Sequence, residues 1–402
     1  MTETKMQFKI TKPNIKVVGI GGGGTNAINR MIELGIDGVD FIVANTDAQA
    51  LSRCLAKTKI HLGPELTKGL GAGGDPEIGK EAAIESEEFI FNALEGADLV
   101  FLTAGMGGGT GTGAISVFGK IAKNIGALTI AIVTMPFSFE TTRRMNFAKD
   151  GVKSLRPHSN TLISIPNDRL LKITSADIPL EVAFRMADDV LRQAVQGIAE
   201  MITQTGMINI DYSHIRSMME LGGGSIMAIG HGEGKNKAVD AINQALNHPL
   251  LDSIPLINAS GIIANFSGSD ELSLNDISEA LNYLQSHADP NAEIVMGFYN
   301  DAKMKDRVQV TLVVTGLVGK SLIELLNAPV RNRVIEKEPQ DEIVENDFTY
   351  IQRKVHRNSE IQNNVNFLED FSKKQLMNDL DTPAYMRKKL RSSGTAAHLS
   401  GD

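Results

Sequence analysis

Short apolar runs rich in β-branched residues alternate along the first half of the chain with segments whose apolar positions recur every three to four residues. The short runs are IKVVGI, VDFIVAN, DLVFLTA, ALTIAIVTM and TLISIP, and the segments between them include NAINRMIEL and AISVFGKIAKNI. Because strands that alternate with helices assemble as βαβ units, the pattern predicts an α/β fold with a doubly wound parallel sheet.

A long helix is predicted over residues 177–204. Its apolar positions keep three-to-four spacing, which is typical of a helix buried along one face; they are Phe184, Ala187, Leu191, Val195, Ile198 and Ile202. Beyond it, the strand-like runs GIIANFSG, AEIVMGFYN and RVQVTLVVTG alternate with the helical runs AVDAINQAL and LNDISEALNYL. They predict a smaller second α/β domain.

From about residue 320 the pattern decays into mixed-charge sequence without sustained periodicity, which is typical of a flexible, disordered linker. A partly helical extension is the alternative, because LIELLNAPV opens this region with a helix-like run. The predicted organisation is an arm (1–12), a nucleotide-binding domain (13–176), the central helix (177–204), a second domain (205–319), a linker (320–376) and a terminal peptide with an extension (377–402).

The composition excludes several classes of protein. A chain that is 42% hydrophobic and 22% charged is ordinary for a globular protein. A net charge of -8 argues against a non-specific nucleic-acid binder, which needs concentrated Lys and Arg. The single cysteine, Cys54, fits a reducing, cytoplasmic setting, and no apolar run approaches the roughly 18 residues of a membrane span.

Three glycine-rich stretches punctuate the predicted nucleotide-binding domain. They are GIGGGGTN at 19–26, GLGAGGDPEIG at 69–79 and GMGGGTGTG at 105–113. Glycine runs are costly to order, but at a strand-to-helix turn they expose backbone N–H groups at a positive helix end, where phosphate oxygens bind. We interpret them as a phosphate cradle rather than as flexible linkers.

The first stretch on its own also matches the dinucleotide fingerprint G-x-G-x-x-G, through Gly19, Gly21 and Gly24, with Asp47 placed as a ribose-binding acid. A nicotinamide-dependent oxidoreductase is therefore an alternative. One pyrophosphate needs one glycine turn, however, whereas three converging turns suit a nucleoside triphosphate. The stretch GDPEIGKE, at 74–81, imitates a Walker motif but has Glu81 where a hydroxyl is required, so that reading is rejected.

The base is indicated by two residues of the long helix. Phe184 and Asp188 stand four apart and share a helix face. An aromatic ring can stack on a base while a neighbouring carboxylate accepts the N1–H and N2–H of guanine, whereas adenine presents an acceptor that a carboxylate would repel. Either residue alone would pass for an ordinary core aromatic or a solvated charge.

Taken together, several blocks closely resemble the FtsZ family, the bacterial tubulin homologues of cell division. The blocks are NTDAQAL at 45–51, GLGAGGDPEIG, GMGGGTGTG, PFSFE, IPNDRLL and FRMADDVL, and the resemblance covers residues 15 to about 318. DLDTPAYMRKK, at 379–389, resembles the carboxy-terminal peptide of that family. The resemblance implies a tubulin/FtsZ-like fold with a Rossmann-like GTPase domain.

The resemblance also implies a site for GTP or GDP with Mg²⁺ on the phosphates and no dedicated protein cage for the metal. The matching positions fall in the glycine loops, the strand end that follows the first helix, and the ribose and base region: Gly22, Gly23, Gly24, Thr25, Asn26, Asn45, Asp47, Ala72, Gly73, Gly107, Gly108, Gly109, Thr110, Gly111, Thr112, Gly113, Glu140, Arg144, Asn167, Phe184 and Asp188. Glu140 and Arg144 rest on the resemblance alone.

In the family, a loop after the long helix carries carboxylates that polarise the attacking water in the pocket of the next subunit. Here the loop reads GMINIDYSHIRS. Asn209 and Asp211 match the family pattern N-x-D-x-x-D, but His214 replaces the second acid. Histidine accepts a proton only when neutral, so three outcomes are open: slow hydrolysis, His214 as a substitute base, or a near-inactive polymerising paralogue.

The expected function is that of an assembly-dependent GTPase that polymerises head to tail into the division ring. A scaffold deficient in hydrolysis is the alternative, and it shares every binding residue. The expected location is cytoplasmic, at the mid-cell division site on the inner membrane face. Residues 379–389 are expected to dock in grooves of membrane tethers and regulators of the division apparatus, so membrane contact is indirect.

Overall fold

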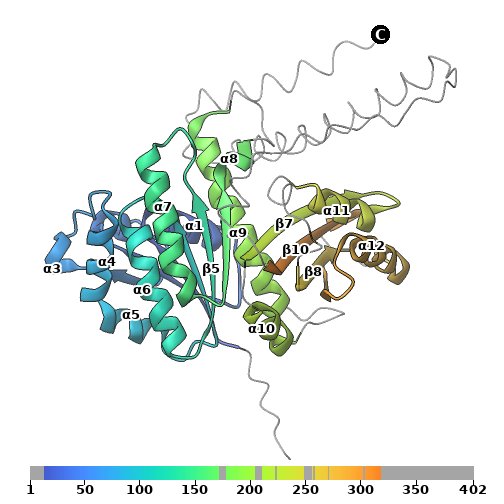
Figure 1. Cartoon of the computed structure of the whole chain (residues 1–402), viewed down its shortest axis with the longest axis horizontal. Coiled ribbons are helices and arrows are strands. Elements are labelled where there is room, and N and C mark those ends of the chain that lie inside the picture. Colours follow the sequence, from blue (N-terminus) through green and yellow to red (C-terminus); the bar gives the residue numbers. More distant parts are fainter. Residues whose placement is uncertain are drawn as a thin grey trace, which may run out of the picture. The chain divides into compact units, whose positions relative to one another are not determined.

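The computed structural model describes residues 13–171, 178–203, 211–221, 224–248, 256, 259–269, 271–301 and 304–317 (Figure 1). The described residues from 13 to 170 and from 179 to 317 belong to one compact unit. The predicted arm, linker and terminal peptide lie outside the described residues, as does Asn209. The domain boundaries therefore stay predictions.

The predicted sheet is confirmed, and it continues into the second half of the fold. Its ten strands are ordered β3-β2-β1-β4-β5-β6-β7-β10-β8-β9. From β3 to β7 neighbouring strands are parallel, β10 is antiparallel to both β7 and β8, and β9 is parallel to β8. The strands are β1 (Ile15–Ile20), β2 (Asp40–Asn45), β3 (Thr58–His61), β4 (Leu99–Gly105), β5 (Leu128–Met135), β6 (Thr161–Pro166), β7 (Gly224–Glu233), β8 (Gly261–Gly268), β9 (Glu293–Asn300) and β10 (Arg307–Leu317).

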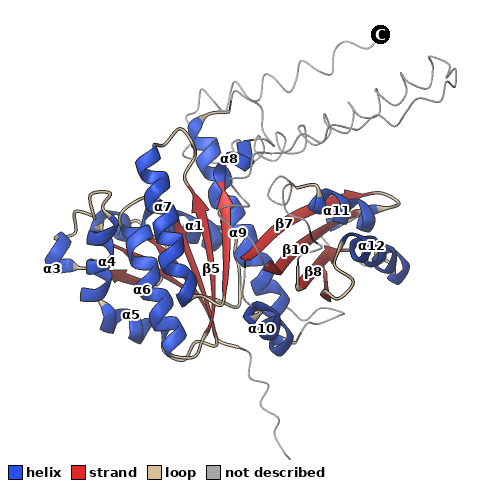
Figure 2. Cartoon of the chain, viewed as in Figure 1, coloured by secondary structure: helices blue, strands red, loops and turns tan. Residues whose placement is uncertain are grey.

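Helices connect the strands and cover the sheet (Figure 2). They are α1 (Gly21–Glu33), α2 (Ala48–Ser52), α3 (Pro64–Thr67), α4 (Pro76–Glu85), α5 (Glu87–Leu94), α6 (Thr110–Asn124), α7 (Thr142–Leu155), α8 (Asn167–Leu170), α9 (Leu180–Thr203), α10 (Tyr212–Glu220), α11 (Lys237–Leu246) and α12 (Leu274–His287), with a short 3-10 helix at Arg156–His158. No helix among the described residues is both long enough and apolar enough to cross a membrane.

Two apolar cores lie on either side of α9. The first packs the buried faces of β1, β4 and β5 against α6, with Phe118 fully buried. The second packs β8 and β10 against α11 and α12 around Phe266. Runs such as LTIAIVTM are buried at every position because helices cover both faces of a doubly wound sheet.

Helix α9 is the predicted long helix, and it bridges the two halves. It contacts α1 in the first half. On the second-domain side, a Cβ on Gly197 would lie 3.0 Å from the Thr311 side chain of β10. The residue at 197 is therefore confined to glycine or a side chain that displaces Thr311, because the helix and strand backbones approach so closely.

Candidate functional site

The glycine stretches converge at the carboxyl ends of β1 and β4. A Cβ on Gly21 would lie 2.7 Å from the backbone N of Gly111, and one on Gly109 would lie 2.9 Å from the Ala72 Cβ and from the backbone N of Asp75. The amino ends of α1, α4 and α6 therefore meet at one edge of the sheet. Ligands of doubly wound sheets bind at this edge.

The first glycine stretch is the opening turn of α1 rather than a separate loop, because α1 begins at Gly21 directly after β1. Gly24 is a packing residue, since its Cβ would lie 2.5 Å from the Thr103 carbonyl oxygen of β4. A Cβ on Gly22 would meet nothing within 4 Å, and Gly22 is exposed together with Asn26. Gly22 thus leaves space beside exposed backbone N–H groups, as a phosphate requires.

The glycines of the stretch at 105–113 also differ in role, because some border open space and others pack against backbone. A Cβ on Gly108 would meet nothing within 4 Å, whereas one on Gly113 would lie 1.9 Å from the Pro76 carbonyl oxygen, because α6 packs tightly on α4. The two threonines of the stretch form hydrogen bonds with neighbouring parts of the site. Thr112 Oγ1 accepts a hydrogen bond from Gly107 N at 2.8 Å, and the Thr110 and Thr46 hydroxyls lie 2.6 Å apart.

The loop before α4 supplies further open glycines, since a Cβ on Gly71, Gly73 or Gly74 would meet nothing within 4 Å. Gly73 has φ +60, is exposed, and would place a Cβ in open space, while Ala72 beside it is buried. Two predicted polar residues near this loop have structural partners: Asp47 Oδ1 caps α2 by accepting from Gln49 N at 2.8 Å, and Asn45 Oδ1 accepts from Asp47 N at 3.3 Å. One oxygen of Asp47 is therefore committed to the helix cap.

The edge suits an anionic ligand. The amino ends of α1 and α6 have no side-chain cap and present positive dipole ends with unsatisfied N–H groups there, whereas Asp75 caps α4. Thr25 Oγ1 and Asn167 Oδ1 are buried without a hydrogen-bond partner in the described part of the chain, and buried polar atoms of that kind need a ligand or water. Within the same part, no three acidic, His or Cys side chains converge as a metal site.

Three aromatic rings form a cluster beside the phosphate edge. Phe137 stacks on Phe139 with centroids 5.0 Å apart, and Phe184 meets Phe137 edge-on at 5.4 Å. Phe139 and Phe184 keep exposed surface. The loop PFSFE is tied to the start of α8 because Ser138 N donates to Asp168 Oδ1 at 2.8 Å. The cluster is an apolar platform on which a planar base can stack.

Glu140 and Arg144 close the side of this platform. The Glu140 carboxylate is buried, accepts from Phe137 N at 2.9 Å and pairs with Arg144 Nη1 at 2.9 Å. Between them, Thr141 has φ 142, a backbone conformation that costs a non-glycine residue energy and is concentrated at functional sites. Arg144 remains half-exposed and available to a ligand.

Asp188 lies on α9 one turn beyond Phe184. Burial and, to a lesser extent, the charge of Asp189 raise the pKa of its carboxyl to about 7, against the opposing effect of Arg30 on α1. An unliganded carboxylate with this pKa is costly to ionise, so donors that reach it from a ligand are strongly favoured. The N1–H and N2–H groups of guanine are donors of that kind.

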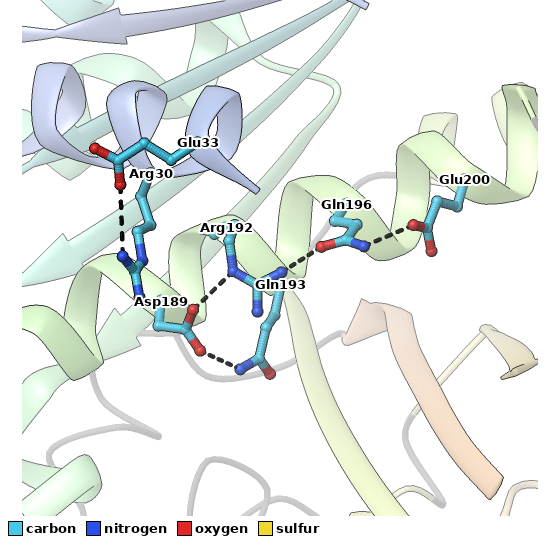
Figure 3. A network of polar contacts seen from close by, with 7 residues as sticks. All are labelled: Arg30, Glu33, Asp189, Arg192, Gln193, Gln196 and Glu200. Carbon is cyan, nitrogen blue, oxygen red and sulfur yellow. Dashed lines mark hydrogen bonds and ion pairs between the residues drawn. The ribbon is translucent and has the colours of Figure 1, made fainter. Parts of the chain in front are cut away.

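A chain of polar contacts runs along α9 from Asp189 to Glu200 (Figure 3). Asp189 accepts from Arg192 Nε at 2.7 Å and from Gln193 Nε2 at 2.5 Å. Arg192 also contacts Gln196, which donates to Glu200 at 2.6 Å. Both oxygens of Asp189 are therefore used by the helix's own side chains, which leaves Asp188 as the acid of this pair for a ligand.

Asp211 and His214, two of the three predicted catalytic residues, lie at the opposite end of the sheet. Asp211 is the N-cap residue of α10, His214 N donates to Asp211 O at 2.9 Å, and both residues are exposed. The hydroxyl of Tyr212 donates to the carbonyl of Asp98, which immediately precedes β4. Near the other end of α10, the Met219 carbonyl accepts from Thr161 Oγ1, at the first residue of β6. Helix α10 is thus anchored at the amino ends of β4 and β6.

The phosphate loop follows the carboxyl end of β4, whereas α10 contacts the residue before its amino end. A strand of this length spans about 20 Å at about 3.3 Å per residue. Asp211 and His214 therefore lie too far from the phosphate edge of their own chain to act there. The structure brings the predicted nucleotide residues together and separates them from Asp211 and His214.

Several residues of the site were missed by the sequence analysis: Thr46, Phe137, Phe139, Thr141 and Tyr212. The alternation of two phenylalanines in PFSFE was the available signal for the aromatic platform, and nothing in the local sequence indicated the partner of Tyr212 or of Thr46.

Two segments match known protein families. Residues 14–175 match the GTPase domain of the tubulin/FtsZ family. Residues 223–318 match the C-terminal domain of the FtsZ family. The first segment contains the phosphate loops and Glu140, Arg144 and Asn167, and the second contains the strands and helices of the second core.

Solved structures agree with these matches. An empty FtsZ dimer from M. jannaschii is 44% identical, with a TM-score of 0.73, and the match covers 76% of this chain and 89% of that one. A mutant of M. jannaschii FtsZ matches with the same identity and TM-score and is covered to 92%. A GTPγS-bound protofilament of CetZ2 from Haloferax volcanii is 18% identical with a TM-score of 0.67, covering 78% of this chain and 96% of that one, and shares the fold.

Proposed function

The chain belongs to the tubulin/FtsZ family of GTPases, and from this premise we propose that it polymerises head to tail and hydrolyses GTP at the junction between subunits. The observation that carries the proposal is the position of Asp211 at the end of the sheet opposite the phosphate edge. A site divided in this way is completed when the α10 end of one subunit docks on the phosphate edge of the next, which is a heterologous contact that repeats along a filament.

The surface around the phosphate edge supports such a contact. Leu70, between the glycines of the 69–74 loop, is 84% exposed, and Leu180 at the start of α9 and Phe139 are also exposed. Large apolar side chains next to a polar site mark surfaces that a partner covers. The similarity to an FtsZ dimer from M. jannaschii agrees with self-association.

Each group has a defined part in the reaction of GTP with water to GDP and phosphate. The N–H groups around Gly22, Gly73 and Gly108 bind the phosphates, and Asp188 accepts the guanine hydrogens while the aromatic rings stack on the base. Asp211 of the adjoining subunit accepts the proton of the attacking water. Mg²⁺ on the phosphate oxygens would neutralise part of their charge.

The cellular role we propose is that of the cell-division ring on the cytoplasmic face of the membrane, with residues 379–389 binding tethers and regulators. A polymerising scaffold with little hydrolysis is the second function, and the substitution at His214 is the observation that favours it. The oxidoreductase alternative is disfavoured by the match of residues 14–175 to the GTPase domain of the tubulin/FtsZ family.

Sedimentation with four nucleotides separates these functions, when phosphate release is followed in parallel. We expect pelleting with GTP and with a slowly hydrolysed analogue, less with GDP and none with NADH. Pelleting with GTP without phosphate release would favour the scaffold. Binding of NADH in proportion to protein, without assembly, would contradict the proposal.

Restoring the second acid tests the role of position 214. His214→Asp is expected to raise turnover about tenfold at matched polymer content, because a carboxylate is ionised at neutral pH and accepts a proton in every subunit. Phosphate release per pelleted subunit is the measurement, with His214→Asn as the control that removes the base without adding an acid. Equal turnover in wild type and His214→Asp would remove this residue from the reaction.

A further inference from the structure

The hydroxyl of Tyr212 joins α10 to the point where three strands of the nucleotide-binding half begin. It donates to the Asp98 carbonyl at 2.7 Å, and the same carbonyl accepts from Leu128 N, at the start of β5, at 2.9 Å. Asp98 also holds the residues before β1, since Asn14 N donates to its carboxylate at 2.8 Å and Asp98 N donates to Asn14 O at 2.9 Å. The Tyr212 ring therefore ends on a rigid corner of the sheet.

The rest of α10 is fixed independently. Ile215, Met218 and Met219 are buried, and Thr161 Oγ1 donates to the Met219 carbonyl at 2.9 Å. The first turn is different, because Asp211 forms no side-chain capping bond to α10 and is exposed together with His214. The Tyr212 hydroxyl ties this turn to the sheet by a hydrogen bond.

We propose that Tyr212 is a positioning residue, which holds Asp211 and His214 in register for the nucleotide of the adjoining subunit. The inference rests on the proposed split site. A terminal helical turn frays readily when it lacks a cap. A catalytic group that moves by about 1 Å loses up to about 100-fold in rate, so an anchor one residue from Asp211 acts on turnover rather than on nucleotide binding.

The test isolates the loop of one subunit from its own pocket. Asp211→Asn protein in excess is copolymerised with a small fraction of loop donors, which are wild type, Tyr212→Phe or Tyr283→Phe. The loop of each donor meets the unaltered nucleotide pocket of a neighbouring Asp211→Asn subunit. The donor's own pocket meets the inactive loop of another Asp211→Asn subunit. Tyr283 is the matched control, because its hydroxyl donates to Asn243 on the second domain at 3.3 Å, away from α10.

Tyr212→Phe donors are expected to release phosphate about three- to tenfold more slowly than wild-type donors, because the hydroxyl that bonds the Asp98 carbonyl and Arg216 is lost from the catalytic turn. Tyr283→Phe donors are expected to match wild type. The critical concentration and the GTP affinity of pure Tyr212→Phe protein are expected to be unchanged. A general loss of folding would change both.

Two results would overturn the inference. One is equal phosphate release from Tyr212→Phe and wild-type donors. The other is a loss that appears when Tyr212→Phe is placed in the pocket-supplying Asp211→Asn chain instead of the donor, since Tyr212 would then act on its own pocket. Failure of the proposed function is distinct: wild-type donors would then give no more phosphate in the presence of Asp211→Asn protein than they give alone.

Discussion

Asp211→Asn is expected to lower phosphate release per polymerised subunit by about 10²- to 10⁴-fold, because the amide cannot take the proton of the attacking water. Nucleotide binding and assembly are expected to persist. Asp211 lies at the amino ends of the strands, about 20 Å from the phosphate edge of its own chain, so its replacement leaves that pocket untouched. Polymers of the variant are therefore expected to outlast those of wild type.

The measurement is phosphate release and pelleting on the same samples. Glu279→Gln on α12 is the matched control, since it makes the same acid-to-amide change at an exposed position of the second domain. The role of Asp211 would be refuted by turnover within a few-fold of wild type at equal polymer content. A loss of GTP affinity in the unassembled variant would instead place Asp211 in its own pocket.

Asp188→Asn is expected to weaken GTP binding by about 10- to 100-fold, because hydrogen bonds to a charged acceptor are replaced by weaker and partly mismatched ones. Titration of the unassembled protein with a fluorescent guanine nucleotide measures the change. Inosine triphosphate lacks the N2 amino group and is expected to lose less affinity than GTP on this substitution. Equal losses for the two nucleotides would argue against contact between Asp188 and that amino group.

The raised pKa of Asp188, about 7, gives wild-type binding a pH dependence with a definite sign. Donors of the guanine base favour the ionised carboxylate, so binding lowers this pKa and releases a proton. Below about pH 7 the affinity is expected to fall by up to tenfold per pH unit, and above it to level off. Asp188→Asn is expected to abolish that dependence, which the same titration between pH 6 and pH 8 checks.

The same shift affects the stability of the unliganded protein. The Asp188 carboxyl has a pKa of 3.8 when it is not perturbed, as in the unfolded chain, and of about 7 in the folded chain. Its contribution to the free energy of unfolding is therefore full below pH 3.8 and is lost as pH rises to about 7. Asp188→Asn without nucleotide is thus expected to melt at a higher temperature than wild type at pH 8. A lower melting temperature at that pH would show that the carboxylate is not destabilised by burial.

The elements of the fold were predictable because each has a local signal. The runs IKVVGI and LTIAIVTM became β1 and β5, and the periodic stretch at 177–204 became α9, since burial on one or both faces sets the period of apolar residues. The first and third glycine stretches follow β1 and β4 at the carboxyl edge, as predicted, because strand-to-helix turns of a parallel sheet all lie there. The second stretch differs from the prediction, since it follows the short helix α3 and not a strand.

The separate roles of the glycines were not predictable, because the residue is the same whether it leaves room for a ligand or for another backbone. Gly22 and Gly24 are two apart in sequence, yet one faces open space and the other the Thr103 carbonyl oxygen. The aromatic platform was missed for a related reason, since Phe137 and Phe184 meet only through tertiary packing.

The position of α10 was equally beyond local sequence. Asp98 and Tyr212 are 114 residues apart, and their hydrogen bond depends on how the chain returns after α9. Without that contact, the matching of Asp211 to a catalytic position rested on resemblance alone. With it, the separation of Asp211 from the phosphate edge of its own chain has a geometric reason.

The most direct test of this account is the rate of phosphate release per subunit, measured from well below to well above the concentration at which polymer first pellets. We predict a rate near zero below that concentration and a sharp rise to a plateau above it, because a single chain holds the phosphates and the catalytic acid at opposite ends of one sheet. A rate per subunit that stays constant across the whole range would show that one chain hydrolyses GTP unaided, and would contradict the divided site.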